Sequence, residues 1–279
     1  MTKKEGGFTS CNLSLEFHSF IQRQSGVLRQ FHKNYECITP LEGKCVCTVN
    51  EHRYELSVGE CIILFPFQVL ELELEPNASV QRIIFNDHLI LTVTQSIEGM
   101  IPKNPVFRPN ESVLDFGLKM IFDTFGEDSG PISRITPFEN RMRIKGLLYM
   151  LAGDFLASTT LITAPKTDIA AMDIALYIAE NFKNNISLKD IAKEKGYNYQ
   201  YLSRTFNRYM NMSFKKMLNF YRIHQAFTML QDTDLPISRI AFECGFKSIR
   251  SFNQVCHDVF NKKPTEIRSM RRISRKCNY

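Results

Sequence analysis

The segment Ile186–Phe206, ISLKDIAKEKGYNYQYLSRTF, decides the fold of the C-terminal half of this chain. A second segment of the same pattern, PISRIAFECGFKSIRSFNQVC, follows at Pro236–Cys256. At an offset of 49 residues the two segments share an isoleucine, an alanine and a glycine, and an offset of 50 then aligns Leu202 with Phe252. The repeat predicts two units of one kind, each with a helix, a tight turn and a second helix.

A glycine lies at the predicted turn of each unit, Gly196 in the first and Gly245 in the second. Glycine adopts the left-handed backbone conformation without a steric penalty, and small Ala192 and Ala241 allow the paired helices to approach closely. This pattern is typical of the helix-turn-helix of DNA-binding proteins, and two copies are a far more specific signal than one. A single helix over Phe214–Leu230 is expected to join the units, which would then meet two successive major-groove segments about 34 Å apart.

Charge is distributed unevenly along the 279 residues, whose net charge is +6. Residues 165–279 carry 20 lysines and arginines against 10 aspartates and glutamates, a balance of +10, whereas residues 1–164 carry 15 against 19, a balance of −4. A basic half beside an acidic half indicates a polyanionic partner for the basic half. A chance excess of solvated basic side chains is the alternative.

The segment Ser187–Arg268 resembles the DNA-binding domain of the AraC/XylS family of bacterial transcription regulators. The resemblance ends in a recognisable tail, KPTEIR at Lys263–Arg268, and departs from the family pattern at Cys256, Asn261 and Lys263. It implies a sequence-specific transcription regulator, an activator, whose partner is double-stranded promoter DNA. RNA polymerase is a second candidate partner.

Helical geometry divides the second helix of each unit into a buried face, with Leu202, Phe206 and Phe252, and an exposed face. By the resemblance, the base-facing positions hold side chains that can read base edges in the major groove: Gln200, Ser203, Arg204, Arg250, Asn253 and Gln254. Each of them would instead contact a phosphate, or only solvent, in the alternative interpretation. The side chains predicted to contact phosphates are Arg208, Arg222, Lys247 and Lys262.

Residues 17–85 contain short apolar runs between turn signals, which predicts a β barrel or sandwich. The run LELELE at Leu70–Glu75 alternates strictly, as in a strand with one wet face. Its leucines are therefore expected to face the interior, and Glu71 and Glu73 to face water.

Regulators of the AraC/XylS family usually carry a separate ligand-sensing or dimerising domain, often a cupin-like β barrel. His32, Glu36 and Gly43 match the spacing of the first cupin motif, but Gln30 and Glu71 stand where two histidine ligands would be. Because these imidazoles are missing, no metal and no other cofactor is expected, and no catalytic residue is assigned. A barrel interior still offers a cavity for a small-molecule effector, for which the candidate binding residues are His32, Tyr35 and Glu36.

Two amphipathic helices are predicted after Pro109. The apolar stripe of the first consists of Leu114, Leu118, Ile121 and Phe125, and that of the second consists of Ile144, Leu148, Leu151 and Phe155. The stripes either pack against the β domain or form a dimerisation surface, and the second stripe is assigned to the interface of a homodimer.

The eight cysteines show no metal-binding spacing and are expected to stay reduced and to pack as small hydrophobic side chains. Cys45 and Cys47 share one face of a predicted strand, so a thiol sensor is conceivable there.

The predicted fold class is α+β, with an N-terminal cupin-like β barrel, a helical dimerisation segment and a C-terminal all-α domain with two helix-turn-helix units. The domains are assigned as 1–108 for ligand sensing and regulation, 109–160 for dimerisation, 161–167 as linker and 168–279 for DNA binding. No signal peptide or membrane-spanning run is expected, which predicts a cytoplasmic protein without a membrane partner.

Three functions remain open on the sequence. The leading hypothesis is a transcription regulator that is controlled by ligand binding or dimerisation through its N-terminal domain. The second is a regulator that is constitutive or controlled by a protein partner, without a small-molecule ligand. The third is a cupin-type metalloenzyme with a DNA-binding tail, against which the missing histidines count.

Overall fold

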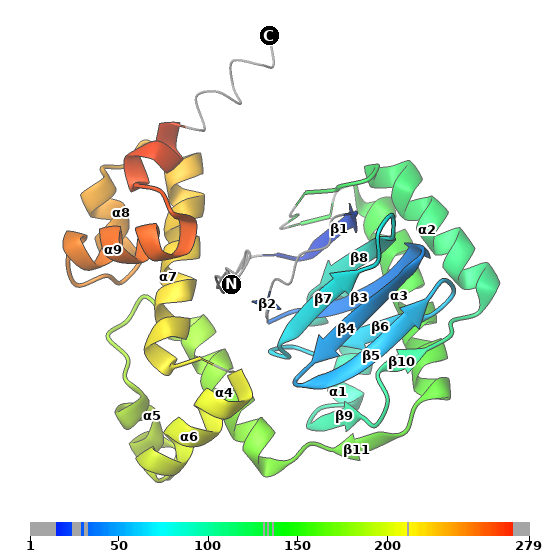
Figure 1. The fold of residues 1–279 in the computed structure, drawn as a ribbon, viewed down its shortest axis with the longest axis horizontal. Helices are drawn as coiled ribbons and strands as arrows, with labels where there is room; N and C mark the ends of the chain where they lie inside the picture. Colours follow the sequence, from blue (N-terminus) through cyan, green and yellow to red (C-terminus); the bar gives the residue numbers. More distant parts are fainter. Residues whose placement is uncertain are drawn as a thin grey trace. The chain divides into compact units, whose positions relative to one another are not determined.

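The computed structural model describes residues 15–269, apart from 24–28, 31–32, 131, 133, 136, 211 and the side chains of Arg29 and Thr167. The chain divides into two compact units, one that extends to Lys166 and one that continues from Thr167. The first is built around β-sheets, and the described elements of the second are all helices, so the fold contains both classes of structure (Figure 1). Each unit is described by itself.

The strands of the N-terminal unit form two antiparallel sheets. The order in the five-stranded sheet is β1 (Phe17–Gln22), β8 (Ser79–Phe85), β3 (Tyr35–Glu42), β6 (Cys61–Leu64) and β10 (Val106–Phe107). The order in the four-stranded sheet is β2 (Arg29–Gln30), β7 (Leu70–Leu74), β4 (Lys44–Val49) and β5 (His52–Ser57).

One hydrophobic core lies between the two sheets. Ile38 and Ile62 of the five-stranded sheet share it with Leu70, Leu72 and Leu74 of β7. The alternation predicted for β7 is confirmed, because its three leucines are buried and the two glutamates between them are only half-buried. Two stacked antiparallel sheets with a common core thus stand where the sequence predicts a barrel or sandwich.

Helices cover the other face of the five-stranded sheet. They are η1 (Asp87–Ile90), α1 (Leu91–Ser96), α2 (Glu111–Phe125) and α3 (Phe138–Ser158), and the last two pack against each other. Gly117 of α2 lies at their contact, since a Cβ atom there would be 2.4 Å from Cδ1 of Leu147. The helices and the sheet enclose a second hydrophobic core.

The structure corrects the assignment of the second stripe to a dimer interface. Ile144, Leu148, Leu151 and Phe155 are between 0% and 4% exposed and belong to the core between α3 and the sheet. An apolar sheet face must be covered, and α3 covers it with the same stripe that a dimer would have used. The alternative in which the stripe packs against the β domain is the one that the structure has.

A small two-stranded sheet precedes the helical unit. It pairs β9 (Met100–Pro102) with β11 (Leu161–Thr163), and α4 (Lys166–Asn181) begins shortly afterwards. The first residues of the expected 161–167 linker are therefore part of a strand.

The C-terminal unit consists of α4, α5 (Leu188–Glu194), α6 (Tyr199–Met210), α7 (Phe214–Asp232), α8 (Ile237–Glu243), α9 (Ile249–Phe260) and a short helical segment at 264–269. The pairs α5–α6 and α8–α9 are the two predicted helix-turn-helix units, and α7 joins them (Figure 1). Among the described helices of the chain, none is long and apolar enough to cross a bilayer.

Candidate nucleic-acid interface and effector site

The turns of the two units have the same hydrogen bonds. Gly196 and Gly245 have φ angles of +72° and +86°, which is the left-handed conformation that the sequence predicts. The next residue in each turn donates back to the preceding helix, with 2.8 Å from Tyr197 N to Ala192 O and 3.0 Å from Phe246 N to Ala241 O. This arrangement satisfies the carbonyls at the end of the first helix and sets the direction of the second.

The second helix of each unit begins at a capped residue. Asn198 Oδ1 accepts from the backbone N–H groups of Gln200 and Tyr201 at 2.9 and 3.1 Å, and Ser248 Oγ accepts from that of Ser251 at 3.2 Å. The caps are 50 residues apart, so the offset that aligns Leu202 with Phe252 also aligns the starts of the two helices. Caps of this kind stabilise helix starts by about 1 kcal/mol each.

The buried stripe of each second helix is the predicted one. Leu202 and Phe206 of α6 and Phe252 and Cys256 of α9 are all 0% exposed. The opposite faces are therefore directed away from the core of the unit.

The six predicted base-contacting side chains lie on these opposite faces. All of them are exposed except Ser203, which is half-buried. The structure places three on each second helix: Gln200, Ser203 and Arg204 on α6, and Arg250, Asn253 and Gln254 on α9. Positions 200, 203 and 204 correspond to 250, 253 and 254 at the same offset of 50. Each helix thus presents hydrogen-bonding groups from equivalent positions.

The two faces differ in charge. One further helical turn along, α6 has Arg208 where α9 has Asp258, which accepts from Gln254 Nε2 at 2.8 Å. The face of α6 therefore carries two arginines, whereas that of α9 carries Arg250 together with a carboxylate. We expect the first unit to depend more strongly on phosphate contacts.

Other exposed side chains lie beside these faces, and helical geometry predicts the exposure of two of them, Tyr199 and Ile249. Tyr197, Tyr199 and Tyr201 are between 38% and 49% exposed around the start of α6. Beside α9 lies an open cavity of about 730 Å³ whose lining includes the predicted exposed residues Ile249, Arg250 and Asn253, together with three residues outside the prediction: His257, Lys263 and Thr265. The exposure of Tyr199 and Ile249, which correspond at the offset of 50, is confirmed, whereas Tyr197 and Tyr201 are exposed side chains that the sequence interpretation does not include.

The structure separates the four predicted phosphate contacts. Arg208, Lys247 and Lys262 are exposed, but Arg222 is only 7% exposed. Its Nε donates to Phe182 O at 2.7 Å and its Nη2 donates to Asn184 O at 2.9 Å, and burial lowers the pKa of its guanidinium. The phosphate assignment of Arg222 is corrected, because a guanidinium enclosed by backbone carbonyls is not available to DNA.

The structure does not group the three candidate effector-binding residues. His32 lies outside the described residues. Tyr35 and Glu36 are neighbours on β3 and point to opposite faces of the sheet, because side chains alternate along a strand. Burial, with smaller effects of Asp87 and Glu98, raises the pKa of Tyr35 to about 12.

Glu36 is part of a buried polar cluster. Its carboxylate is 2.5 Å from Arg82, and both side chains are at most 2% exposed. Arg82 also donates to Gln22 Oε1 at 2.9 Å and to Gln30 Oε1 at 2.6 Å, and it lies 5.1 Å from the ring centre of Phe20. Paired in this way, the Glu36 carboxylate is a structural group of the sheet core.

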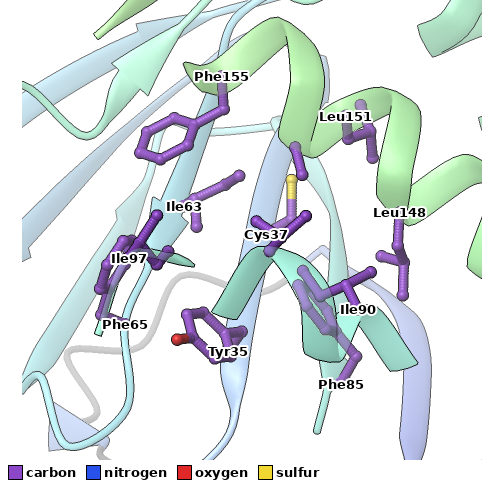
Figure 2. Close-up of a pocket in the computed structure, with 12 residues that line it drawn as sticks. Tyr35, Cys37, Ile63, Phe65, Phe85, Ile90, Ile97, Leu148, Leu151 and Phe155 are labelled. Atoms are coloured by element: carbon purple, nitrogen blue, oxygen red, sulfur yellow. The ribbon is translucent and has the colours of Figure 1, made fainter. Parts of the chain in front are cut away.

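Tyr35 lines an apolar cavity between the five-stranded sheet and the helices that cover it. Figure 2 shows its hydroxyl oxygen at the edge of a group of carbon side chains that includes Phe65, Phe85, Leu148 and Phe155. The cavity has a volume of about 20 Å³, room for a single water-sized group. No three His, Cys, Asp or Glu side chains are grouped as metal ligands in the described part of the chain.

The described cysteines pack as predicted. Cys37, Cys45, Cys47, Cys61, Cys244 and Cys256 are all buried, whereas Cys11 and Cys277 lie outside the described residues. A hydrogen bond with Cys47 lowers the pKa of the Cys45 thiol, and the same bond, with burial, raises that of Cys47. Both thiols are at most 1% exposed, which argues against a sensor that must meet an oxidant in solution.

Comparison with known proteins is consistent with two DNA-reading helices in one unit. Residues 191–270 match the family described as "Helix-turn-helix domain". The chain is 22% identical over 243 residues to the Msm operon regulatory protein of Streptococcus mutans, covering 84% of each chain. It is 21% identical over 260 residues to the HTH-type transcriptional activator RhaS of Shigella boydii, covering 92% of this chain and 86% of that protein.

Other matches cover different shares of the chain. The chain is 29% identical over 94 residues to the melibiose operon regulatory protein of Escherichia coli K12, and the match covers 34% of this chain and 31% of that protein. The solved structure of ToxT from Vibrio cholerae has a TM-score of 0.55 at 17% identity, covering 91% of this chain and 98% of that one. At this identity the likeness concerns the fold.

These features define a DNA-binding transcription regulator, and the named relatives are regulators, not enzymes. The repeated helix-turn-helix and the tail after α9 agree with the resemblance to the AraC/XylS family, and the matched family model, at residues 191–270, extends from within the first helix pair to beyond the second.

Proposed function

We propose that the chain is a sequence-specific activator of transcription in which α6 and α9 enter two successive major-groove segments of one promoter site. The observation that carries this proposal is the pair of equivalent exposed faces, each with hydrogen-bonding side chains at the same three helical positions. One α-helix joins the two units, so a single chain reads a long site that is not palindromic.

The proposed contacts follow from the chemistry of the exposed side chains. Arginine pairs with guanine, and glutamine or asparagine pairs with adenine, each through two hydrogen bonds. We assign base reading to Gln200, Ser203, Arg204, Arg250, Asn253 and Gln254, and phosphate contacts to Arg208, Lys247 and Lys262. The phosphate contacts fix the register of the protein on the duplex and make its affinity depend on salt.

The N-terminal unit is proposed to control DNA binding. We assign residues 1–108 to a cupin-like sensor domain, 109–160 to dimerisation, 161–167 to the linker and 168–279 to DNA binding, and two stacked antiparallel sheets support the sensor assignment. The apolar cavity beside Tyr35 favours an effector with an apolar body. A ToxT structure is described as having an unsaturated fatty acid bound, so fatty acids are the first class to test.

The cavity is smaller than any such molecule. An effector would therefore have to displace α1 or α3, and this displacement would couple ligand binding to the rest of the chain. Control through dimerisation or a protein partner is a second candidate, favoured by the outer surface of α2 and α3. There Phe116, Phe122 and Phe138 are between 54% and 71% exposed, and Met142 and Tyr149 continue the row that starts at Phe138.

Selection of DNA by the full chain tests the proposal. The protein would be mixed with a library of random duplexes, and the bound duplexes would be sequenced after several rounds. We expect one enriched site with two separate conserved segments about one helical turn apart. Enrichment of a single short segment, or of none, would contradict the proposal.

A further inference from the structure

Arg222 lies in the middle of α7, the helix that joins the two helix-turn-helix units. Its guanidinium holds two backbone carbonyls, Phe182 O at 2.7 Å and Asn184 O at 2.9 Å. Both belong to the segment directly after α4, which leads into α5 and so into the first unit. Without the guanidinium these two carbonyls would lose the hydrogen bonds that tie them to α7.

The turn of the second unit packs against the same segment. A Cβ atom at Gly245 would be 2.6 Å from Lys183 O, 2.9 Å from Phe182 O and 3.0 Å from Arg222 Nε. Two of these atoms are backbone carbonyl oxygens and cannot move away as the end of a flexible side chain can. Any residue other than glycine would therefore push the turn away from residues 182–184.

Residues 182–184, Arg222 and Gly245 together form what we call the junction. It joins the end of α4, the middle of α7 and the turn between α8 and α9, three places that are far apart in sequence. The rings of Phe182 and Tyr221 stack beside it, with their centres 6.2 Å apart. Burial that lowers the pKa of the Arg222 guanidinium agrees with this enclosed position.

The first unit has no equivalent contact among the described residues. Gly196 has a φ angle of +72°, close to the +86° of Gly245, but a Cβ atom there would meet nothing within 4 Å. The two turns are therefore equivalent in backbone conformation and different in packing. Left-handed geometry explains the glycine in the first unit, whereas the second unit needs glycine for close approach as well.

We propose that the junction sets the distance and orientation between the two helix-turn-helix units, and that Arg222 and Gly245 are positioning residues that touch no DNA. The consequence for DNA rests on the proposed function. Two recognition helices read one site only if their separation matches successive major-groove segments, about 34 Å apart. A connecting helix alone fixes its own length, but it leaves each unit free to pivot at the loops that follow α6 and precede α8.

Distance measurement between spin labels in the full chain tests the proposal without DNA. One nitroxide would be placed on α5 through Lys193→Cys and the other on α8 through Ser238→Cys, at exposed positions. Cys11 and Cys277 would first be replaced by serine, since the six described cysteines are buried. Pulsed electron paramagnetic resonance then gives the distribution of distances between the two units.

The matched pair of variants is Gly245→Ala and Gly196→Ala, which share the strain of a positive φ angle and differ in the clash. We expect Gly245→Ala to shift or broaden the distance distribution, and Gly196→Ala to keep the wild-type distribution. Arg222→Met should broaden it too, because the apolar side chain keeps the packing and loses both hydrogen bonds. Arg208→Met, at an exposed position, should not.

An unchanged distribution in Gly245→Ala and Arg222→Met would overturn the proposal. If Gly245→Ala fails to fold, as circular dichroism would reveal, Arg222→Met and the milder Arg222→Lys decide in its place. In DNA binding, the junction variants should lose affinity for the complete selected site and keep the wild-type affinity for a duplex with only one of its two segments. If the chain selects no DNA site but the variants show the expected distance changes, the proposed function is contradicted, whereas the proposal that the junction positions the two units is supported.

Discussion

At the scale of single residues, the exposed arginines of α6 separate sequence reading from phosphate binding. Arg204→Ala should lower affinity for the selected site by about 1–3 kcal/mol and leave affinity for random duplex nearly unchanged, because a bidentate contact to guanine discriminates between bases. Fluorescence anisotropy with both duplexes measures the difference.

Arg208→Ala, four residues further along the same helix, is the matched control. It should weaken binding to both duplexes equally and reduce the slope of log affinity against log salt by about one. Equal loss on both duplexes for Arg204→Ala would make that arginine a phosphate contact as well.

His224 makes the stability of the helical unit depend on pH. Burial lowers the pKa of its imidazole from 6.5 to about 4, against a hydrogen bond to Phe220 O that acts in the opposite direction. Below pH 6.5 the unfolded chain binds a proton at this site that the folded chain does not, so stability falls as the pH falls from about 6.5 to about 4. At pH 5 this group lowers the free energy of unfolding by about 2 kcal/mol relative to pH 7.

His224→Phe should reduce this loss, because phenylalanine keeps the ring contacts with Phe220 and Phe260 and cannot bind a proton. Urea denaturation of the full chain at pH 7 and pH 5 measures the difference. His257→Phe, which removes an exposed histidine of α9, should keep the wild-type dependence. The same loss in His224→Phe as in the wild type would show that other groups control acid unfolding.

The identity of a residue predicts its backbone conformation better than it predicts whether its side chain is buried. Gly196 and Gly245 have the predicted left-handed conformation, and Asn261, which stands where the family usually has glycine, also adopts it with φ of 52° at the end of α9. Arg222 is predicted wrongly because its burial depends on carbonyls some 40 residues away in sequence, which no local pattern reveals.

At the scale of secondary-structure elements, α3 has two faces that the sequence cannot assign to partners. Leu148→Glu places a charge in the core of the N-terminal unit, where Leu148 is 2% exposed, and should destabilise the fold by several kcal/mol. Tyr149→Glu lies on the outer face at 40% exposure and should leave the melting temperature nearly unchanged. If the outer face of α2 and α3 forms the homodimer, Tyr149→Glu should be monomeric.

Light scattering of both variants at equal concentration measures their mass. A dimer that persists in Tyr149→Glu would place the interface elsewhere. Helical periodicity predicts correctly that one face of α3 is apolar, yet a stripe that covers a sheet and a stripe that meets a second chain have the same pattern. Whether the stripe of α3 packs on the sheet or on a second chain depends on whether the five-stranded sheet has an uncovered apolar face. That face arises from the order of the strands in the sheet, which the sequence of each single strand does not reveal.

At the scale of the whole molecule, the order of a β-rich and a helical unit is predictable because the apolar period changes along the chain. The alternation in β7 and the repeat in the helical unit are both local patterns, and both are found. The stacking of two sheets and the pairing of Glu36 with Arg82 depend on contacts between distant strands. Sequence reasoning therefore assigned Glu36 to an effector, whereas the fold uses it inside its own core.

The N-terminal unit should respond to an effector that enters beside Tyr35. Thermal melting of the full chain with a panel of fatty acids measures this, since a ligand at a hundredfold excess over its dissociation constant adds about 2.7 kcal/mol. Ala152→Leu fills the cavity from α3 and should abolish the shift. Overpacking itself costs about 1–3 kcal/mol, so the comparison is between the shifts with and without ligand and not between melting temperatures.

Binding of the Ala152→Leu variant to the selected DNA site controls for damage to the other unit, and it should equal that of the wild type without effector. A ligand shift that survives in Ala152→Leu would place the effector outside this cavity. A wild-type chain that responds to no fatty acid would favour the second candidate, in which the exposed aromatic side chains of α2 and α3 meet a protein. Because Tyr149 is exposed and does not line the cavity, whereas Ala152 is buried and does, Tyr149→Glu and Ala152→Leu test the two forms of control separately.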